Sequence, residues 1–415
     1  MTVSWNNQYN PNELARYIEE CKKVDNSGQA HFEGFRFMEY EVLLYSMLDF
    51  PDAVPEIEGR RIARQAIFRA GRTGEIVPNN LLAEANRLTQ EYVQRPLERY
   101  VLATTLSFLT SASLRRVRMG NTIVIFEQNL PYRYQSGRVQ IVENARHSLF
   151  AEPPTDYLFT RVHVSAKSSY EAMDKAIDTL DLVRGIWNWF HNRRHWIRSS
   201  SGRRAPVNKI VLGPLHTLHY LTGEPATEAW WYQPEYCGAV SPYNPSEDDI
   251  NSMARFFDDI RNRLAKSNYR EVLEQAIIRY GRSLDMRDWE GAFLKLWSIL
   301  ELLTNSCHDN NIVTARRAAY IYEDRDFALQ VLKHLRDYRN RSVHADVGNA
   351  AIETYVYQLK GFVEALLGFH LGSSYGFESV EEAARFLELP SDRDAIETRI
   401  QMLQYAQEFR GYTQT

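Results

Sequence analysis

The chain has 415 residues, 44% hydrophobic and 25% charged, with a formal net charge of −4 at pH 7. This length predicts two or three domains, and the ordinary composition excludes a disordered or fibrous protein. The slightly negative charge excludes a uniformly basic surface, so any contact with nucleic acid must come from a local patch.

The three cysteines lie far apart without a CxxC pair, which favours a reduced, cytoplasmic protein over a zinc or redox motif. No signal-peptide pattern opens the sequence. No apolar run reaches the roughly 18 residues that a membrane-spanning helix needs. We therefore expect no membrane partner.

Residues 1–245 are predicted to form an α+β domain that senses a ligand or positions a substrate. Helical spacing of apolar residues, interrupted by Gly, Pro and Asn, predicts helices at 13–24, 37–50, 58–71 and 79–94, within residues 1–95. Residues 96–240 change to short β-branched and aromatic segments, with a helix at 170–191. The expected strands lie within 98–109, 122–128, 138–143, 157–166, 209–221 and 228–236, with a turn at 119–121 between two of them.

Residues 246–415 are predicted to form an all-α domain. The segment SPYNPSEDD marks the boundary, and Ser246 and Asp249 are spaced as a capping box for the first helix. The expected helices are 247–265, 268–284, 287–305, 312–323, 325–342 and 350–370. A short helical tail follows, with capping pairs Ser379/Glu382 and Ser391/Asp394.

The stretch 335–349, LRDYRNRSVHADVGN, places Arg339 five residues before His344. A guanidinium offers a planar fork of donors suited to phosphate, and an imidazole exchanges protons near neutrality. Together they suit RNA cleavage by its own 2′-hydroxyl, with His344 as acid or base and Arg339 stabilising charge on phosphorus.

Residues five apart on an unbroken helix point about 140° away from each other. We therefore expect the helix to end near Ser342, with Asn349 capping the next one. Spacing alone does not identify the pair, because Arg184 and His191 fit the same loose pattern of an Arg followed by a His after four to six intervening residues.

The stretch 335–349 resembles the signature of the HEPN ribonuclease superfamily, in which an Arg and a polar residue precede a His at a junction of two helices. These are Arg339, Asn340 and His344 here, with Ala345 where a Gly often follows. Two upstream segments resemble the Apea-like branch. They are 289–305, through Trp297, Ser298, Leu300, Glu301 and Leu303, and 314–324, through Arg317 and Ala319.

The resemblance implies an all-α HEPN bundle that dimerises through residues 246–370 and cleaves RNA, such as tRNA or mRNA, without a metal or other cofactor. It implies that Arg339 and His344 are catalytic and that Asn340 orients them. Many members act in toxin, phage-defence or RNA-processing roles. Others have lost the chemistry and serve as dimerisation modules that bind nucleotide, RNA or protein, which is the alternative here.

Glu301 admits two interpretations. Its carboxylate either orients Arg339 or His344 across the bundle or faces solvent. Adjacent aspartates at 248–249 and 258–259 would diverge on a helix, so we predict no metal site. A third hypothesis is an interaction scaffold whose front domain does the work.

The run 187–204 is the most basic and aromatic segment of the chain. Its arginines, with Arg341, are candidate RNA contacts, because guanidinium groups bind phosphates and flat rings stack on unpaired bases. Alternatively, its tryptophans belong to the core and its arginines make a loop soluble. The candidate RNA-binding residues are Arg193, Arg194, Arg198 and Arg341.

Overall fold

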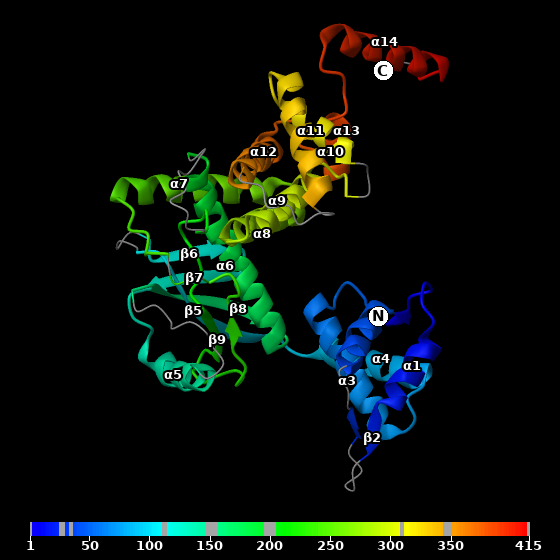
Figure 1. Cartoon of the computed structure of the whole chain (residues 1–415), viewed down its shortest axis with the longest axis vertical. Helices are drawn as coiled ribbons and strands as arrows, with labels where there is room; N and C mark the ends of the chain where they lie inside the picture. The colour runs from blue at the N-terminus through cyan, green and yellow to red at the C-terminus, as the bar shows by residue number, and fades with distance from the viewer. Residues whose placement is uncertain are drawn as a thin grey trace.

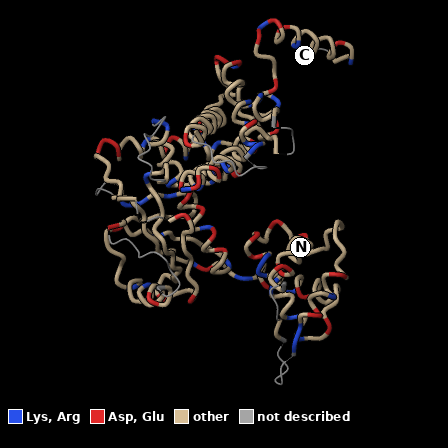
Figure 2. The backbone as a smooth tube through the Cα atoms, in the orientation of Figure 1, with Lys and Arg blue, Asp and Glu red and all other residues tan. Residues whose placement is uncertain are grey.

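The computed structural model describes residues 2–24, 30–32, 36–109, 114–146, 156–194, 205–236, 238, 240–307, 311–342 and 351–412. Within these ranges the chain is a mixed α/β protein, 59% helical, with 14 helices and a six-stranded sheet. None of the described helices combines the length and apolar character needed to cross a membrane. Figure 2 shows acidic and basic residues interspersed along most of the backbone.

The N-terminal helices form a unit with its own hydrophobic core, set apart from the sheet in Figure 1. Small buried residues, such as Ala63, Ala66 and Ala70, line the face of α3. The helices are α1 (Pro11–Glu20), α2 (Arg36–Ser46), α3 (Glu56–Thr73) and α4 (Pro78–Gln94), close to their predicted positions. Two short antiparallel strand pairs complete the unit. They are β1 (Ser4–Trp5) with β4 (Leu48–Asp49), and β2 (Lys22–Val24) with β3 (Ala30–Phe32).

An antiparallel sheet follows, with strand order β10-β9-β5-β8-β7-β6. Its strands are β5 (Glu98–Leu106), β6 (Arg116–Met119), β7 (Thr122–Glu127), β8 (Leu158–Ala166), β9 (Leu215–Tyr220) and β10 (Trp231–Tyr232). Alternation along β5 sends Leu102 into the core shared with α6 (Ser169–Asn192) and Val101 into a small cluster with Tyr134 of α5 (Tyr132–Arg146). The predicted turn at 119–121 is confirmed, with Gly120 at φ +53°.

The strand predicted at 138–143 is wrong, because these residues lie inside α5. Val139 and Ile141 gave the segment a strand-like composition. However, the buried residues Tyr134, Arg138, Ile141 and Ala145 follow helical spacing. Arg138 donates to the backbone oxygens of Ala103 and Leu215, which attaches this face of α5 to the sheet.

Every helix predicted after residue 246 is present. They are α7 (Glu247–Lys266), α8 (Arg270–Asp285), α9 (Trp289–Leu303), α10 (Asn311–Ala319), α11 (Arg325–Ser342), α12 (Ile352–Gly372), α13 (Val380–Phe386) and α14 (Arg393–Phe409). Ser246 caps α7 by accepting from the Asp249 amide, and Ser379 caps α13. The cap predicted at Ser391 is wrong, because α14 begins at Arg393 and Asp392 accepts from the Ala395 amide.

The sheet and the C-terminal helices share one larger hydrophobic core, centred on α6. This core includes buried residues from both sides of the boundary predicted at residues 245/246, and the separate N-terminal core ends with α4, before β5. Helices α6 and α8 approach closely where Gly185 meets Gly281. A Cβ on Gly185 would lie 2.9 Å from the backbone oxygen of Ile277.

Gly185→Ala is therefore expected to destabilise the protein by about 1–3 kcal/mol, because the added methyl group meets backbone that cannot rotate away. Urea unfolding measures this. Gly368→Ala in α12 is the control, because its Cβ would meet no atom within 4 Å. It is expected to leave stability unchanged or raise it slightly. Equal effects of the two substitutions would contradict the close approach.

Candidate functional site

Arg339 lies in the last described turn of α11, and the predicted end of this helix near Ser342 falls at the edge of the described residues. Leu332, Leu335 and Tyr338 form the buried face of this helix, and the Tyr338 ring packs edge-on against Phe293 of α9 at 5.0 Å between centroids. This packing sets the rotation of α11 and leaves the Arg339 side chain partly exposed, at 32%.

Glu301 of α9 faces Arg339. Its Oε1 accepts a hydrogen bond from the Trp297 indole at 2.9 Å and lies 3.9 Å from Nη2 of Arg339. The Glu301 side chain is only 17% exposed, so its carboxylate is held between the indole and the guanidinium. The structure thus brings together Arg339 and Glu301, from segments 38 positions apart in the sequence.

Asn340 and Arg341 are exposed on the same turn of α11. His344 lies outside the described residues, as does Asn349, the predicted cap of the next helix. The described cap of α12 is Ala351, whose side chain has no capping group.

Two side chains support the C-terminal end of α9, a role that the sequence patterns did not predict for either of them. Arg317 of α10 donates to the carbonyl oxygens of Thr304 and Asn305, both at 2.8 Å, where helix carbonyls lack intrahelical partners. His370 of α12 donates from Nε2 to the Leu303 carbonyl at 2.9 Å. A lone polar residue in the apolar end of α12 was the available signal for His370.

His370 is neutral in the fold. The Tyr269 hydroxyl donates to its Nδ1 at 3.0 Å, so both ring nitrogens have partners without a second proton. Burial lowers the pKa of His370 from 6.5 to about 4, although its bond to Leu303 acts in the opposite direction.

This lowered pKa predicts a loss of stability in acid. The stability gained by burying neutral His370 is fully present above pH 6.5, the pKa of a histidine in the unfolded chain. It is lost as the pH falls toward 4, because the unfolded chain binds the proton more readily than the folded one. At pH 5 the loss is about 2 kcal/mol. Urea unfolding at pH 7 and pH 5 should show a smaller pH-dependent difference for His370→Gln than for wild type. An unchanged difference would contradict the neutral buried histidine.

The first arginines of the basic run lie at the C-terminal end of α6, against α7. The Arg193 guanidinium lies 4.5 Å from the ring centre of Phe256, and Arg194 lies 4.0 Å from Asp249. Both arginines are exposed, whereas Trp187 and Trp189 are buried in the core. Arg198 lies outside the described residues.

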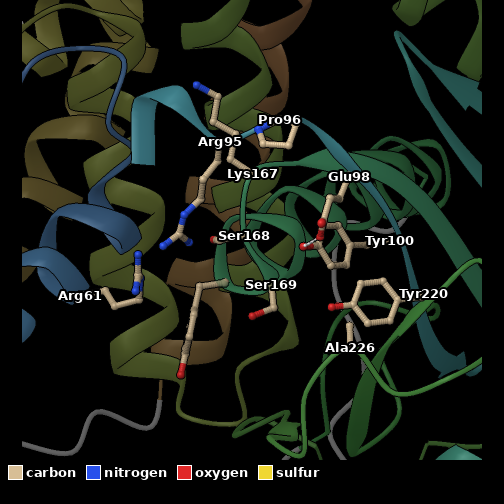
Figure 3. Close-up of a pocket in the computed structure, with 11 residues that line it drawn as sticks. Arg61, Arg95, Pro96, Glu98, Tyr100, Lys167, Ser168, Ser169, Tyr220 and Ala226 are labelled. Carbon is tan, nitrogen blue, oxygen red and sulfur yellow. Dashed lines mark hydrogen bonds between the residues drawn. The ribbon is translucent and has the colours of Figure 1, made fainter. Parts of the chain in front are cut away.

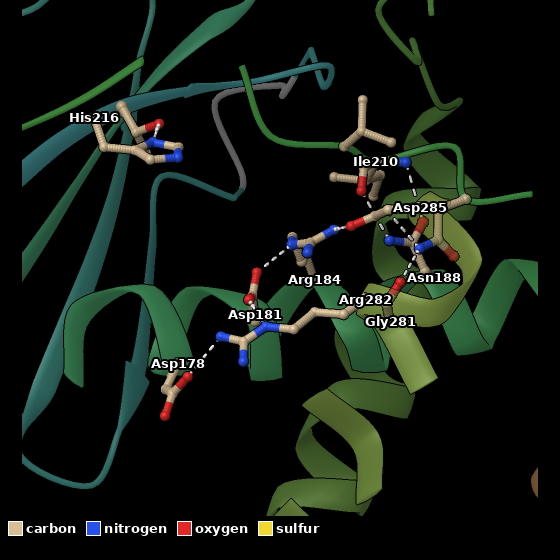
Figure 4. A network of polar contacts seen from close by, with 12 residues as sticks. Asp178, Asp181, Arg184, Asn188, Ile210, His216, Gly281, Arg282 and Asp285 are labelled. Carbon is tan, nitrogen blue, oxygen red and sulfur yellow. Dashed lines mark hydrogen bonds and ion pairs between the residues drawn. The ribbon is translucent and has the colours of Figure 1, made fainter. Parts of the chain in front are cut away.

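The other Arg and His pair of the loose pattern, Arg184 and His191, is buried. Arg184 binds Asp181 and Asp285, each at 2.6 Å, and Asp181 also accepts from Arg282 (Figure 4). Burial would raise the pKa of Asp181, but Arg184 and Arg282 hold it below its ordinary value. These contacts join α6 to α8, which gives Arg184 a role in the core.

No group of three or more His, Cys, Asp or Glu side chains that could hold a metal occurs among the described residues. Comparisons of this chain with protein-family models, curated proteins and solved structures found no match.

Proposed function

We propose that the protein is an RNA endonuclease of the Apea-like HEPN branch, with an α+β front part followed by a HEPN bundle formed by the helices after residue 246. The contact between Glu301 and Arg339 carries this proposal. It joins two of the segments in which the sequence resembles that branch. It also leaves the arginine accessible in the last described turn of α11, close to the position of His344 in the sequence.

Each residue has a role in the proposed reaction. The RNA 2′-oxygen forms a bond to phosphorus as the bond from phosphorus to the 5′-oxygen breaks, which leaves a 2′,3′-cyclic phosphate and a 5′-hydroxyl. His344 takes the proton of the nucleophile or gives one to the leaving oxygen. Arg339 binds the charged phosphoryl oxygens, and its planar fork can do so while Glu301 holds it from one side.

The other predicted residues extend the site. Asn340 orients the catalytic pair. Arg341, on the exposed side of the same turn, and Arg193, Arg194 and Arg198 contact the RNA backbone. A second copy of the chain brings its own Arg and His set to the cleft, through a dimer built by residues 246–370. The reaction needs no metal, and RNA restriction in phage defence or a toxin-like process is the proposed role.

The test is cleavage of end-labelled RNA in EDTA by wild type and His344→Ala. We expect cleavage by wild type and none by the variant, because the proton transfers lose their carrier. Equal cleavage by both proteins would contradict the assignment. RNA binding without cleavage by wild type would instead favour the catalytically inactive binding module.

A further inference from the structure

A cavity of about 360 Å³ lies where the N-terminal helices meet the sheet and the start of α6 (Figure 3). Figure 3 shows the side chains of Arg61 and Arg95 on one side, Tyr100 and Tyr220 on the other, and Ser168 and Ser169 between them. Its volume lies in the range of small-molecule sites. The lining comes from α3, from the α4–β5 link with β5, from the β8–α6 turn with the start of α6, and from β9 with the segment that follows it.

Three basic side chains, Arg61, Arg95 and Lys167, line the cavity. Arg61 is neutralised by the buried Glu58, at 2.7 Å. Lys167 donates from Nζ to the Val93 carbonyl at 2.6 Å, an acceptor without a formal charge. Figure 2 shows positive residues at this link between the N-terminal helices and the sheet.

Arg95 is the cation most available to a ligand. Within the described part of the chain its guanidinium has no hydrogen bond or ion pair, and the residue is exposed. The one carboxylate that lines the cavity, Glu98, accepts a hydrogen bond from the Tyr100 hydroxyl at 2.7 Å. Among the lining side chains, Arg95 and Lys167 are thus without a carboxylate partner, although the Glu91 carboxylate lies close enough for Arg95 to act with Arg69 in lowering its pKa.

The N-terminus of α6 adds hydrogen-bond donors to these charges. Ser168 caps this helix of 24 residues by accepting from the Glu171 amide. The amides of Ser169 and Tyr170 have no acceptor among the described residues, because they precede the first intrahelical bonds. Backbone amides at a helix N-terminus favour a phosphate group.

Flat rings line the same cavity. Tyr220 and Tyr170 are 37% and 43% exposed, and Tyr100 packs beside Tyr220 with the ring centroids 5.6 Å apart. An adjoining cavity of about 550 Å³ shares Arg61 and Tyr170. An exposed ring offers a base a stacking surface, and a guanidinium offers a phosphate a charged donor.

We propose that this cavity binds a nucleoside monophosphate, with the phosphate against Arg95 and the α6 N-terminus and the base against the tyrosine rings. The observations that carry the proposal are a cavity of suitable size, an unpaired guanidinium, unpaired amides and exposed rings in one place. The proposal does not depend on the nuclease assignment.

Such a ligand would connect the two hydrophobic cores. The seam around the cavity is otherwise held by polar contacts, including the hydrogen bond from Tyr92 to Glu171 at 2.9 Å. Helix α6 extends about 36 Å from the cavity, through the buried Arg184 network, to Arg193. A nucleotide bound here would hold the N-terminal unit against the helix that supports the rest of the protein.

The test is calorimetric titration of the full chain with AMP, GMP, CMP and UMP, and separately with inorganic phosphate and adenosine. We expect at least one monophosphate to bind more tightly than phosphate or adenosine. Arg95→Ala should weaken that binding at least tenfold. Arg99→Ala is the matched control, because Arg99 is exposed on β5 outside the cavity lining and should leave the affinity unchanged.

A short 5′-phosphorylated RNA forms another arm of the titration. The proposal would be overturned if none of the four monophosphates binds, whether or not the RNA does. Equal affinity of wild type and Arg95→Ala would also overturn it, provided that both proteins show the same urea unfolding midpoint.

Discussion

Arg339→Ala is expected to slow RNA cleavage by about 10²- to 10³-fold, the usual cost of removing a donor that stabilises charge in the transition state. Arg339→Lys should recover little of the rate, because an ammonium group lacks the planar fork that binds two phosphoryl oxygens. Single-turnover rates in EDTA measure both effects. This substitution is the most direct change to the proposed site within the described residues.

Two further variants distinguish catalysis from general damage. Arg336→Ala removes a guanidinium one turn earlier on α11, paired with Asp337, and should leave the rate near that of wild type. Glu301→Gln keeps an acceptor for the Trp297 indole but removes the charge beside Arg339, and a smaller loss, about tenfold, is expected. A folded Arg339→Ala protein that cleaves RNA at the wild-type rate would exclude Arg339 from the chemistry.

Arg184→Ala is expected to destabilise the protein by about 3–5 kcal/mol, because it leaves the buried carboxylates of Asp181 and Asp285 without their shared cation. The free energy of unfolding in urea at pH 7 measures the loss. Arg263→Ala is the control, because its pair with Asp259 on α7 is exposed and should contribute less than about 1 kcal/mol. Similar losses in the two variants would contradict the structural role of the Arg184 network.

The sequence predicted the helices well because apolar spacing is a local property. The α7 cap, for example, followed from the spacing of Ser246 and Asp249. Helix α5 was missed because β-branched residues dominated a short window. Its helical stripe became visible only once the sheet that covers it was known.

Of the two candidate sites, the sequence indicated one and gave no sign of the other. Arg339 and Glu301 could be named from the sequence because the resemblance supplied both segments, although their contact is tertiary. The cavity beside Arg95 gave no local signal, since its lining comes from segments spread from α3 to β9. The joining of the sheet and the C-terminal helices into one core likewise depends on long-range packing around α6, which no local pattern predicts.

The measurement that tests the nuclease proposal most directly uses an RNA oligonucleotide and the same oligonucleotide with a single 2′-deoxy substitution at the cleaved position. We expect wild type in EDTA to leave a 2′,3′-cyclic phosphate and a 5′-hydroxyl on the RNA and to spare the substituted bond. Cleavage of the substituted bond at an equal rate would contradict attack by the 2′-hydroxyl. Failure of the wild-type protein to cleave any RNA would contradict the proposed activity itself.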